Sequence, residues 1–578
     1  MAAERRNFWT IIATVWLAAT LVLAAMQVLT PGDRPLLADT DDAMRMVTAT
    51  DLLDGQPWQD TNQYRDNAPY GISMHWSRLV DAPLAVLIAL ERIIGMSDLA
   101  AILWPLLLLA PLLALSALWA ERIAGPGQTL AALALPLLSL PILAEFSPGR
   151  VDHHNVQIVL TGGLALALAD STNHRNAPVI AGLLAAASLA IGMETLPFVV
   201  LAIALVCLNW AFDPLRWRRP MVGFALALAL ANTGFFLLAV PPSAYLARVC
   251  DSISLTYVTA AALAAAVMLI AARFGPENLK TLSSRLLLLA ILGGLAVGAM
   301  LMLFPECARG PYSLVDPRMM ALMDAMAETR PLWVVLRDQP GLALAMVLPP
   351  LAAMLVMVAR LRATSGAEQL AWIVLLSFLA LALLMTIVQF RSARFTAALA
   401  VPAGVWLVAE TRRRYLAGTG PARAAGLVAA WLAFAGIAQF PAVNLLATLA
   451  PAPALAAPPR PGFFVAREKC FTAGNFAELA ALPPGIVLAP PTLGPHILHY
   501  TPHSVVSAAF HRNTEGTLDA LTFYEDDEQT ARAIVAQRNV DYVVGCPAIP
   551  AIRTWSWLKP MSPPQAPLEI LAIVESAP

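Results

Sequence analysis

Residues 99–120 read LAAILWPLLLLAPLLALSALWA, without one ionisable side chain. A helix rises about 1.5 Å per residue, so a run of this length crosses the ~30 Å hydrocarbon core of a bilayer. Similar runs recur along the chain of 578 residues, of which 59% are hydrophobic and only 13% charged. Soluble domains carry about 25% charged residues. The sequence therefore predicts a polytopic α-helical membrane protein and excludes a string of water-soluble domains.

Thirteen apolar runs are candidates for membrane spans. The first covers residues 8–29 and follows a basic start. It is longer than the apolar core of a signal peptide, about 7–15 residues, so we expect it to be retained with a cytoplasmic N-terminus. The other predicted spans are residues 99–120, 129–146, 155–170, 178–192, 196–212, 221–240, 255–272, 286–304, 342–359, 370–388, 396–410 and 423–447.

Basic residues indicate which loops stay in the cytoplasm, because short loops rich in Arg and Lys are rarely translocated. The predicted inside loops carry Arg122, Arg175, Arg216, Arg218, Arg219, Arg273, Lys280, Arg285, Arg360, Arg362, Arg412, Arg413 and Arg414. An odd number of spans puts the C-terminal region opposite the N-terminus, whereas one miscounted span would invert everything after it. We expect a multi-pass protein of a bacterial inner membrane with a periplasmic C-terminal domain.

The chain divides into a membrane part and a small soluble part. Apolar bursts such as DYVVGCP alternate with helix-like stretches near the C-terminus, which is typical of a small α/β domain. An amphipathic stretch at residues 79–94 is typical of a helix on the membrane surface. The predicted parts are a transmembrane domain over 1–448 with long outer loops at 30–98 and 305–341, a Pro-rich linker over 449–462, and an extracytoplasmic α/β domain over 463–578.

The five cysteines form no CxxC pair and no zinc-ligand spacing. Cys470 and Cys546 both lie in the predicted C-terminal domain. A disulfide between them is open if that domain is outside the cytoplasm, and two unpaired thiols are an equal alternative.

Ionisable residues beside membrane spans are costly, so they are candidates for function. The motif LADTDDAMRM, residues 37–46, follows the first span and holds Asp39, Asp41, Asp42 and Arg45. Closely spaced carboxylates suit a hard divalent cation or a general base. The alternative is a solvated acidic loop or a helix N-cap.

A second acidic motif, SPGRVDHHNVQ, covers residues 147–157 at the mouth of the fourth predicted span. Asp152 and His154 are separated in the sequence by His153. Carboxylate and imidazole groups both ligate divalent metals. A single histidine is usually structural, but an Asp-His-His run at a span mouth indicates a metal site.

Two further motifs also fall on the predicted outer face. The loop after the ninth span contains Glu328, in AMAETRP, where an ordinary interfacial helix is the alternative. QFRSARF places Arg391 and Arg394 at the mouth of the twelfth span. Arginine is the preferred bidentate partner of phosphate, whereas simple contact with lipid headgroups is the alternative.

These four motifs together resemble the GT-C superfamily of membrane glycosyltransferases, and within it the catalytic subunits of oligosaccharyltransferases. The likeness covers about residues 8–447. The order of the motifs, their common face, the predicted number of spans and the extracytoplasmic C-terminal domain all match that family's layout.

The resemblance implies roles for the acidic motifs. The stretch from DTDDAMRM to PYGISMHWSRLVD is similar to the family's first outer loop, whose metal-binding Asp falls on Asp41 or Asp42. SPGRVDHH is similar to the family's second acidic motif, which makes Asp152 and His154 metal ligands. The metal would be Mg²⁺ or Mn²⁺.

The resemblance also covers the other two motifs. AMAETRP is similar to a Ser-Val-x-Glu-x-x-Pro motif on the family's mobile outer loop, which makes Glu328 the acid near metal and acceptor. QFRSARF is similar to the segment that contacts the lipid-linked phosphate, through Arg391 or Arg394. Three more residues at outer positions are candidate contacts to donor or acceptor: Glu194, His75 and Arg78.

One family motif is missing from this sequence. The Trp-Trp-Asp-Tyr-Gly motif, which reads the Ser or Thr of an N-glycosylation site, does not occur. The C-terminal domain instead offers YTPHSVVSAAFHRN, whose polar side chains either contact an acceptor glycan or are structural: His503, His511, Arg512 and Asn513. We favour the structural reading, and peptide acceptors are in doubt.

The predicted function is metal-assisted, inverting transfer of a sugar or oligosaccharide from a polyprenyl-(pyro)phosphate carrier to a glycan, lipid or protein acceptor. Asp41 or Asp42, with Glu328, would act on the acceptor. The alternatives are a metal-independent transferase that uses a polyprenyl-monophosphate sugar, a lipid or polysaccharide transporter, and a non-catalytic assembly protein. A transporter would carry ionisable residues near the membrane midplane, and these spans are nearly free of them. The net charge of −1 excludes a generally basic nucleic-acid binder.

Overall fold

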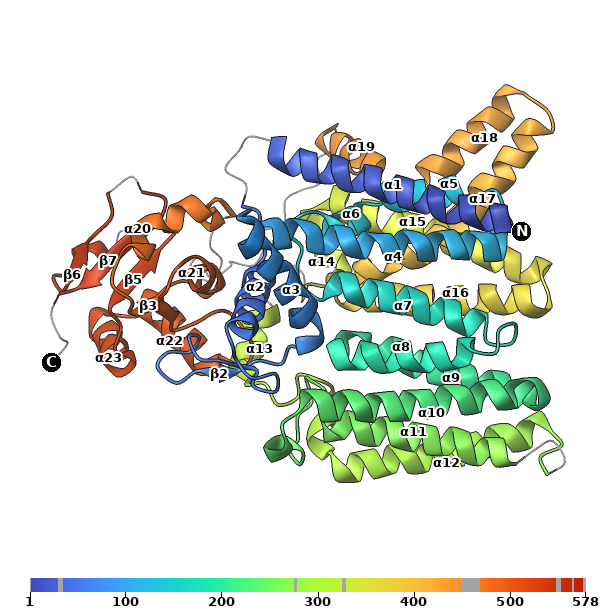
Figure 1. The fold of residues 1–578 in the computed structure, drawn as a ribbon, viewed down its shortest axis with the longest axis horizontal. Coiled ribbons are helices and arrows are strands. Elements are labelled where there is room, and N and C mark those ends of the chain that lie inside the picture. Colours follow the sequence, from blue (N-terminus) through green and yellow to red (C-terminus); the bar gives the residue numbers. More distant parts are fainter. Residues whose placement is uncertain are drawn as a thin grey trace.

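The structure is a computed structural model that describes residues 2–29, 35–274, 278–324, 329–449, 468–546, 552–563 and 566–574. Figure 1 shows a bundle of roughly parallel helices with the C-terminal sheet at one end and the N-terminus at the other. The bundle helices are α1 (Ala2–Leu29), α4 (Leu99–Ala124), α5 (Thr129–Leu137), α6 (Leu140–Phe146), α7 (His154–Ala169), α8 (Ala177–Ile191), α9 (Leu196–Phe212), α10 (Pro214–Ala239), α11 (Leu255–Arg273), α12 (Leu282–Leu303), α15 (Pro340–Ala363), α16 (Gly366–Val388), α17 (Ala393–Leu416), α18 (Pro421–Leu432) and α19 (Gly436–Leu449).

The predicted polytopic helical fold is confirmed. Among the described residues, nine helices are long and apolar enough to cross a membrane, and two bent pairs qualify as broken spans. The pair α5 and α6 bends by 75°, and the pair α18 and α19 by 93°. With the shorter apolar helices α7 and α8, these elements occupy each of the thirteen predicted runs. The number that actually crosses a membrane stays a prediction.

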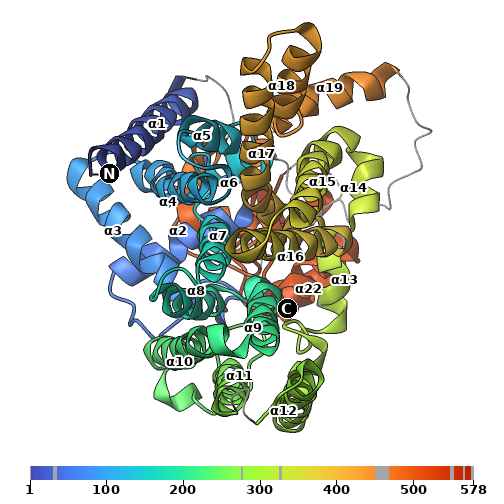
Figure 2. The same cartoon turned by 90° about the vertical axis from the view of Figure 1, so that its right-hand side faces the viewer.

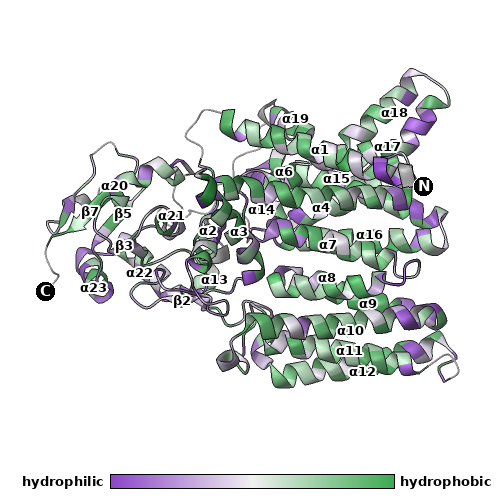
Figure 3. Ribbon diagram, viewed as in Figure 1, coloured by the Kyte–Doolittle hydropathy of each residue, from purple (hydrophilic) through white to green (hydrophobic). Residues whose placement is uncertain are grey.

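Polar residues gather at the two ends of the bundle, whereas the helices are apolar along their length (Figure 3). Seen along the helix axes, α7, α16 and α17 lie near the middle and α12 lies at the periphery (Figure 2). The apolar window of α17 is 83% buried, whereas that of α12 has no buried residue. Helix α12 packs against α11 and α9 but leaves Leu287, Ile291 and Leu295 exposed, as a lipid-facing helix at the edge of the bundle would.

Short helices cross the end of the bundle next to the C-terminal sheet (Figure 1). They are α2 (Thr40–Leu53), α3 (Arg78–Ile94), α13 (Pro317–Asp324) and α14 (Leu332–Asp338). Helix α3 forms where the amphipathic stretch predicts a helix, and Val86 and Ile93 on it are exposed. Its position on a membrane surface stays a prediction. Helix α2 is buried over most of its length.

The C-terminal region is the small α/β domain that the sequence predicts. Its five-stranded sheet has the order β4-β3-β5-β7-β6. Strand β3 pairs in parallel with β4 and β5, and β7 pairs antiparallel with β5 and β6. The elements are α20 (Ala477–Ala480), β3 (Ile486–Leu488), α21 (Gly494–Tyr500), β4 (Ser504–Val505), α22 (Thr514–Glu525), α23 (Glu528–Arg538), β5 (Tyr542–Gly545), β6 (Leu558–Pro560) and β7 (Glu569–Ile573). The exact domain boundaries stay a prediction, and the linker lies outside the described residues from 450 onward.

A hairpin of the first outer loop joins the membrane part to this domain. It consists of β1 (Asn62–Gln63) and β2 (Ile72–Ser73). Arg65 beside it donates to the backbone carbonyls of Leu498 and Thr501, at 2.8 and 3.1 Å. Buried Asp66 accepts a hydrogen bond from Asn513 at 2.7 Å. Since these contacts are buried or partly buried, the hairpin positions the C-terminal domain over the end of the bundle.

Two disulfides lie at this same end of the molecule. Cys470 and Cys546 are bonded, which settles the alternative that the sequence leaves open. Cys250 and Cys307 form a second bond that the sequence does not predict. Cys207 is a free cysteine within α9. The location of this end outside the cytoplasm stays a prediction.

The Cys470–Cys546 bond gives a test of stability. The two cysteines are separated by 76 residues, and closing a loop of that length stabilises a fold by about 4 kcal/mol. We expect the double variant C470S/C546S to lose that much stability in the C-terminal domain, measured by thermal unfolding in detergent. The control Cys207→Ser should unfold like wild type. If C470S/C546S and Cys207→Ser unfold at the same temperature, the disulfide does not stabilise the domain as expected.

Candidate functional site

A cavity of about 310 Å³ lies where the bundle meets the C-terminal domain. Helices α2, α7, α9 and α16 contribute to its wall, together with loops from the first outer segment and the C-terminal domain. Its polar lining residues are Thr40, Asp41, His75, His153, His154, Glu194, Asp251, Tyr312, Gln389, Arg391, Ser392, Thr492 and His511.

The start of α2 separates the two adjacent carboxylates of the first acidic motif. Asp39 is the N-cap, and its side chain accepts a hydrogen bond from the backbone N–H of Asp41 at 3.1 Å. Successive residues of a helix point about 100° apart, so neighbours face different sides. Asp41 lines the cavity, whereas Asp42 is fully buried.

Asp42 holds the second acidic motif in place. Its Oδ1 accepts hydrogen bonds from the backbone N–H groups of Val151 and Asp152, at 2.8 and 2.9 Å. Its Oδ2 accepts from Arg150 at 2.7 Å. Both carboxylate oxygens therefore have protein donors, and Asp42 lies beneath the cavity as an anchor of the loop. This placement fits a positioning role better than the predicted metal-ligand role.

Gly149 gives the same loop its shape. Its φ of +92° lies in the region that favours glycine, and its N–H donates to the carbonyl of Ala101 at 2.9 Å. A Cβ at this position would lie 2.0 Å from the backbone oxygen of Leu36. The loop therefore passes the neighbouring backbone so closely that only glycine fits.

Asp152, His153 and His154 form a buried cluster of side chains of the types that could hold a metal ion. Their ligand atoms lie within 4.8 Å of one another. Asp152 Oδ1 lies 2.6 Å from His153 Nδ1 and accepts from Arg45 at 3.3 Å. Asp152 Oδ2 lies 3.1 Å from His154 Nε2 but has no hydrogen-bond partner. Burial alone would raise the pKa of Asp152, but the two histidines and Arg45 outweigh it and hold the pKa well below its usual range.

Arg45 is the buried cation of this cluster. It also pairs with Asp81 at 2.8 Å, and its guanidinium stacks on Trp76 with its central carbon 4.1 Å from the ring centre. A buried charge needs such partners, because an unpaired ion is strongly disfavoured away from water. Arg45 thus fixes the position of Asp152 from the side of α2.

A chain of ion pairs leads from this cluster to the predicted phosphate-binding segment. His154 Nδ1 lies 3.3 Å from one carboxylate oxygen of Glu194, and Arg391 lies 3.3 Å from the other. Arg391 also donates to the hydroxyl of Tyr312 at 3.4 Å. Arg394 lies behind, where it donates to the carbonyl of Arg391. Glu194 therefore connects the histidine cluster and the arginine.

The predicted site residues are thus placed as follows. Asp41, His75, His154, Glu194 and Arg391 line the cavity, whereas Asp42, Asp152 and Arg394 are buried around it. Arg78 does not line this cavity; it is buried between the carbonyl of Thr48 and Asp81, and it lines a neighbouring cavity. Glu328 lies outside the described residues.

Sequence reasoning did not assign Arg150, Asp251 or Tyr312 to the site, and it placed Arg45 in the first acidic motif without giving it a role. A signal exists for both arginines, because buried carboxylates beside a membrane require nearby cations. Asp251 and Tyr312 have no local signal. Asp251 lies in the loop between α10 and α11 and Tyr312 in the loop between α12 and α13, far along the chain from the acidic motifs, and only the tertiary contact brings them to the cavity.

No family model matches the chain, and no curated protein matches it. Solved structures do match. The archaeal oligosaccharyltransferase AglB from Archaeoglobus fulgidus, in complex with an inhibitory peptide and a dolichol-phosphate, is 15% identical, with 94% of this chain and 70% of that chain covered and a TM-score of 0.65. The oligosaccharyltransferase of the same organism in complex with Zn and sulfate is 12% identical, with 92% and 68% covered and a TM-score of 0.61. The arabinofuranosyltransferase AftD from Mycobacteria is 15% identical, with 97% and 41% covered and a TM-score of 0.52. At these identities the likeness concerns the fold.

Proposed function

The chain has the GT-C fold, and on that premise we propose that it is a membrane glycosyltransferase. It moves a sugar or oligosaccharide from a polyprenyl-(pyro)phosphate carrier to an acceptor at the bundle end that carries the C-terminal domain. The observation that carries this proposal is the single cavity that gathers Asp41, His154, Glu194 and Arg391 where the apolar helices end. Neighbours of the same fold support it, since one is described with a dolichol-phosphate and another is an arabinofuranosyltransferase.

Arg391 is the proposed phosphate-binding residue. A guanidinium presents paired N–H donors that match phosphate oxygens. Two of its contacts, to Glu194 and to the Tyr312 hydroxyl, have lengths of 3.3 and 3.4 Å, and a phosphate would replace such long contacts. Arg394 supports it from behind by donating to its backbone carbonyl. The donor phosphate would therefore lie beside Glu194.

Asp152 and His154 fit a divalent cation. Asp152 offers a buried carboxylate oxygen without a hydrogen-bond partner, and a histidine nitrogen lies 3.1 Å from it. Both atoms are ligands that divalent metals accept. A bound Mg²⁺ or Mn²⁺ would supply charge neutralisation for the phosphate leaving group. A neighbour of the same fold is described with Zn and sulfate, which supports a metal and an anion in this fold.

Asp41 is the proposed acid that orients or deprotonates the acceptor. It is the carboxylate of the first motif that reaches the cavity. A general base must lie within hydrogen-bond reach of the proton that it takes, and buried Asp42 does not meet this requirement. Attack from one side on a sugar held by its phosphate on the other gives inversion at the anomeric carbon. The acceptor stays open.

One observation favours a second candidate, a metal-independent transferase that uses a polyprenyl-monophosphate sugar. Asp152 already has cationic or hydrogen-bonding partners in Arg45 and His153. Because Arg45 and His153 already neutralise and hold the Asp152 carboxylate, the site does not need a metal for that purpose. Dependence on a divalent cation separates the two candidates.

The test is transfer of radiolabelled sugar from a crude polyprenyl-linked lipid pool, with membranes that contain the protein. We expect label to leave the lipid, and EDTA to lower the rate by about 10²-fold or more, because a Lewis acid contributes several kcal/mol to such a step. Added Mg²⁺ or Mn²⁺ should restore the rate. Transfer that ignores EDTA would favour the monophosphate candidate. No transfer from any lipid fraction by folded protein would contradict both.

A further inference from the structure

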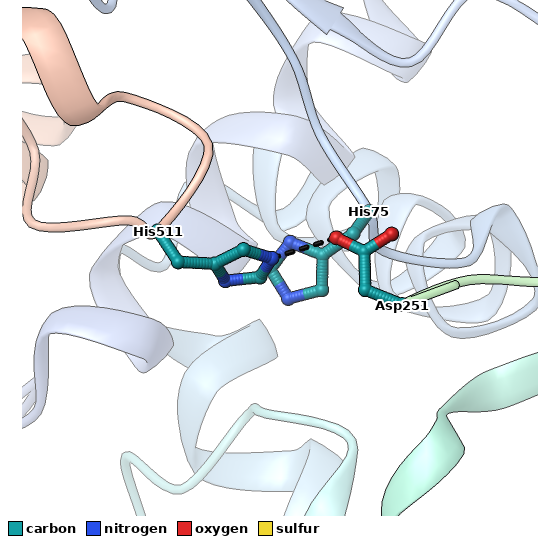
Figure 4. Close-up of side chains that lie close together, drawn as sticks. All are labelled: His75, Asp251 and His511. Carbon is teal, nitrogen blue, oxygen red and sulfur yellow. Dashed lines mark hydrogen bonds and ion pairs between the residues drawn. The ribbon is translucent and has the colours of Figure 1, made fainter. Parts of the chain in front are cut away.

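A second group of metal-ligating side chains lies at the same cavity but comes from other parts of the chain. Figure 4 shows His75, Asp251 and His511 pointing toward one another from three separate segments. Their ligand atoms all lie within 4.8 Å of one another. His75 follows β2 in the first outer loop, Asp251 lies between α10 and α11, and His511 belongs to the C-terminal domain.

Asp251 and His511 are already held in place. His511 Nε2 lies 2.6 Å from Oδ2 of Asp251. Arg512 donates to both oxygens of the same carboxylate, at 2.6 and 2.8 Å. The Cys250–Cys307 disulfide fixes the residue next to Asp251. Two of the three groups therefore have little freedom to move.

His75 is the member of the group whose ring lacks such partners. Its Nδ1 is buried and has no hydrogen-bond partner among the described residues. Its ring centre lies 4.4 Å from that of His511. A buried ring nitrogen without a hydrogen-bond partner beside an Asp–His pair is available as a metal ligand.

We propose that His75, Asp251 and His511 form a second divalent-metal site, suited to Zn²⁺, which fastens the C-terminal domain to the membrane part. Two imidazoles and one carboxylate are a common zinc ligand set, and three protein ligands leave a fourth position open toward the cavity. With zinc–ligand bonds of about 2.0–2.2 Å, the ligand atoms of a tetrahedral site lie roughly 3.4 Å apart. His511 Nε2 and Asp251 Oδ2 lie 2.6 Å apart and would separate slightly on binding, whereas the ligand atoms that lie up to 4.8 Å apart would approach one another.

This site is separate from the Asp152 cluster and does not depend on the proposed function. The ring of Trp76 lies near both groups, with its centre 5.9 Å from that of His75 and 6.4 Å from that of His153. A metal bound between His511 Nε2 and Asp251 would replace the hydrogen bond that joins them. Arg512 keeps its bonds to the carboxylate, which orients that ligand as a neighbouring donor commonly does in zinc sites.

The experiment uses the full-length protein in detergent, stripped with a chelator and titrated with Zn²⁺. Calorimetry gives the stoichiometry, and thermal unfolding gives the stabilisation. We expect His75→Gln to lose one zinc equivalent, or to weaken it by about 100-fold or more, and to lose the matching rise in melting temperature. The variant Asp152→Asn should keep this equivalent. His499→Ala, a histidine of the same domain outside the group, is the control.

His75 makes no hydrogen bond through Nδ1, so His75→Gln should fold without zinc. If that variant does not fold, His511→Gln replaces it and should show the same loss of zinc. Unchanged zinc stoichiometry and affinity in the folded variant would overturn the proposal. So would a wild-type protein that binds no zinc, or one whose zinc is all lost in Asp152→Asn.

Discussion

Asp152→Asn is expected to lower sugar transfer by at least about 10²-fold, even though asparagine has nearly the same volume. Asp152 contributes one carboxylate oxygen to Arg45 and His153 and presents the other toward His154. The amide keeps the shape but removes the charge that a cation or a protonated histidine needs. Loss of one group that stabilises charge in a transition state typically costs 10²–10³-fold in rate.

Asparagine is preferred to alanine here for a physical reason. Both substitutions remove the counter-charge of buried Arg45, but asparagine keeps the side-chain volume and an oxygen that can still accept a hydrogen bond from Arg45, whereas alanine also leaves a cavity. The larger defect of Asp152→Ala would confuse inactivity with unfolding. Asp170→Asn is the matched control, since Asp170 ends the same helix α7 and pairs with Arg122 at 2.8 Å at the opposite end of the bundle.

The measurement is the initial rate of label transfer from the lipid pool, normalised to folded protein by size-exclusion chromatography. Asp170→Asn should transfer at close to the wild-type rate. A folded Asp152→Asn variant with wild-type transfer would remove Asp152 from the mechanism. Equal loss in both variants would show a general effect of unpairing an arginine.

Gly149→Ala is expected to disrupt the site without touching any of its ionisable groups. A Cβ at residue 149 would lie 2.0 Å from the oxygen of Leu36 and 2.9 Å from its carbonyl carbon, and both atoms are backbone. The positive φ adds strain for any residue with a side chain. We expect a loss of more than about 3 kcal/mol in stability, or a displaced loop.

The displacement matters because the loop after Gly149 carries Arg150 and Asp152. Asp42 holds both of these residues, by a side-chain bond and a backbone bond. Movement of the loop would break these bonds and take Asp152 from its place. Transfer should therefore fall together with the melting temperature, both measured as above.

The control is Gly298→Ala in α12. Nothing lies within 4 Å of a Cβ at that position, and alanine is the better helix former. This variant should match or slightly exceed wild type in stability and should transfer normally. A stable, active Gly149→Ala protein would show that the loop adapts, and the close approach to Leu36 would then not determine the site.

The membrane helices are where the sequence alone is most informative. A run such as residues 99–120 forms a helix whatever its neighbours are, because a backbone in lipid must satisfy its own hydrogen bonds. Each of the thirteen predicted runs is occupied by a helix or a bent pair. The α/β character of the C-terminal domain is equally local, since it follows from alternating short patterns. The motifs SPGRVDHH and QFRSARF likewise stand out because charge beside a span is costly.

The tertiary structure decided which of these residues act together. The sequence gives no reason to choose between Asp41 and Asp42 as the functional carboxylate. In the packed structure Asp41 lines the cavity, whereas Asp42 is buried and holds the loop of Asp152. The pairing of Cys250 with Cys307, and the approach of His75, Asp251 and His511, join segments far apart in the chain. A short sequence pattern is enough to predict a helix, because the backbone hydrogen bonds of a helix join residues only four positions apart. Sites built from distant loops depend on how those elements pack, and no short stretch of sequence carries that information.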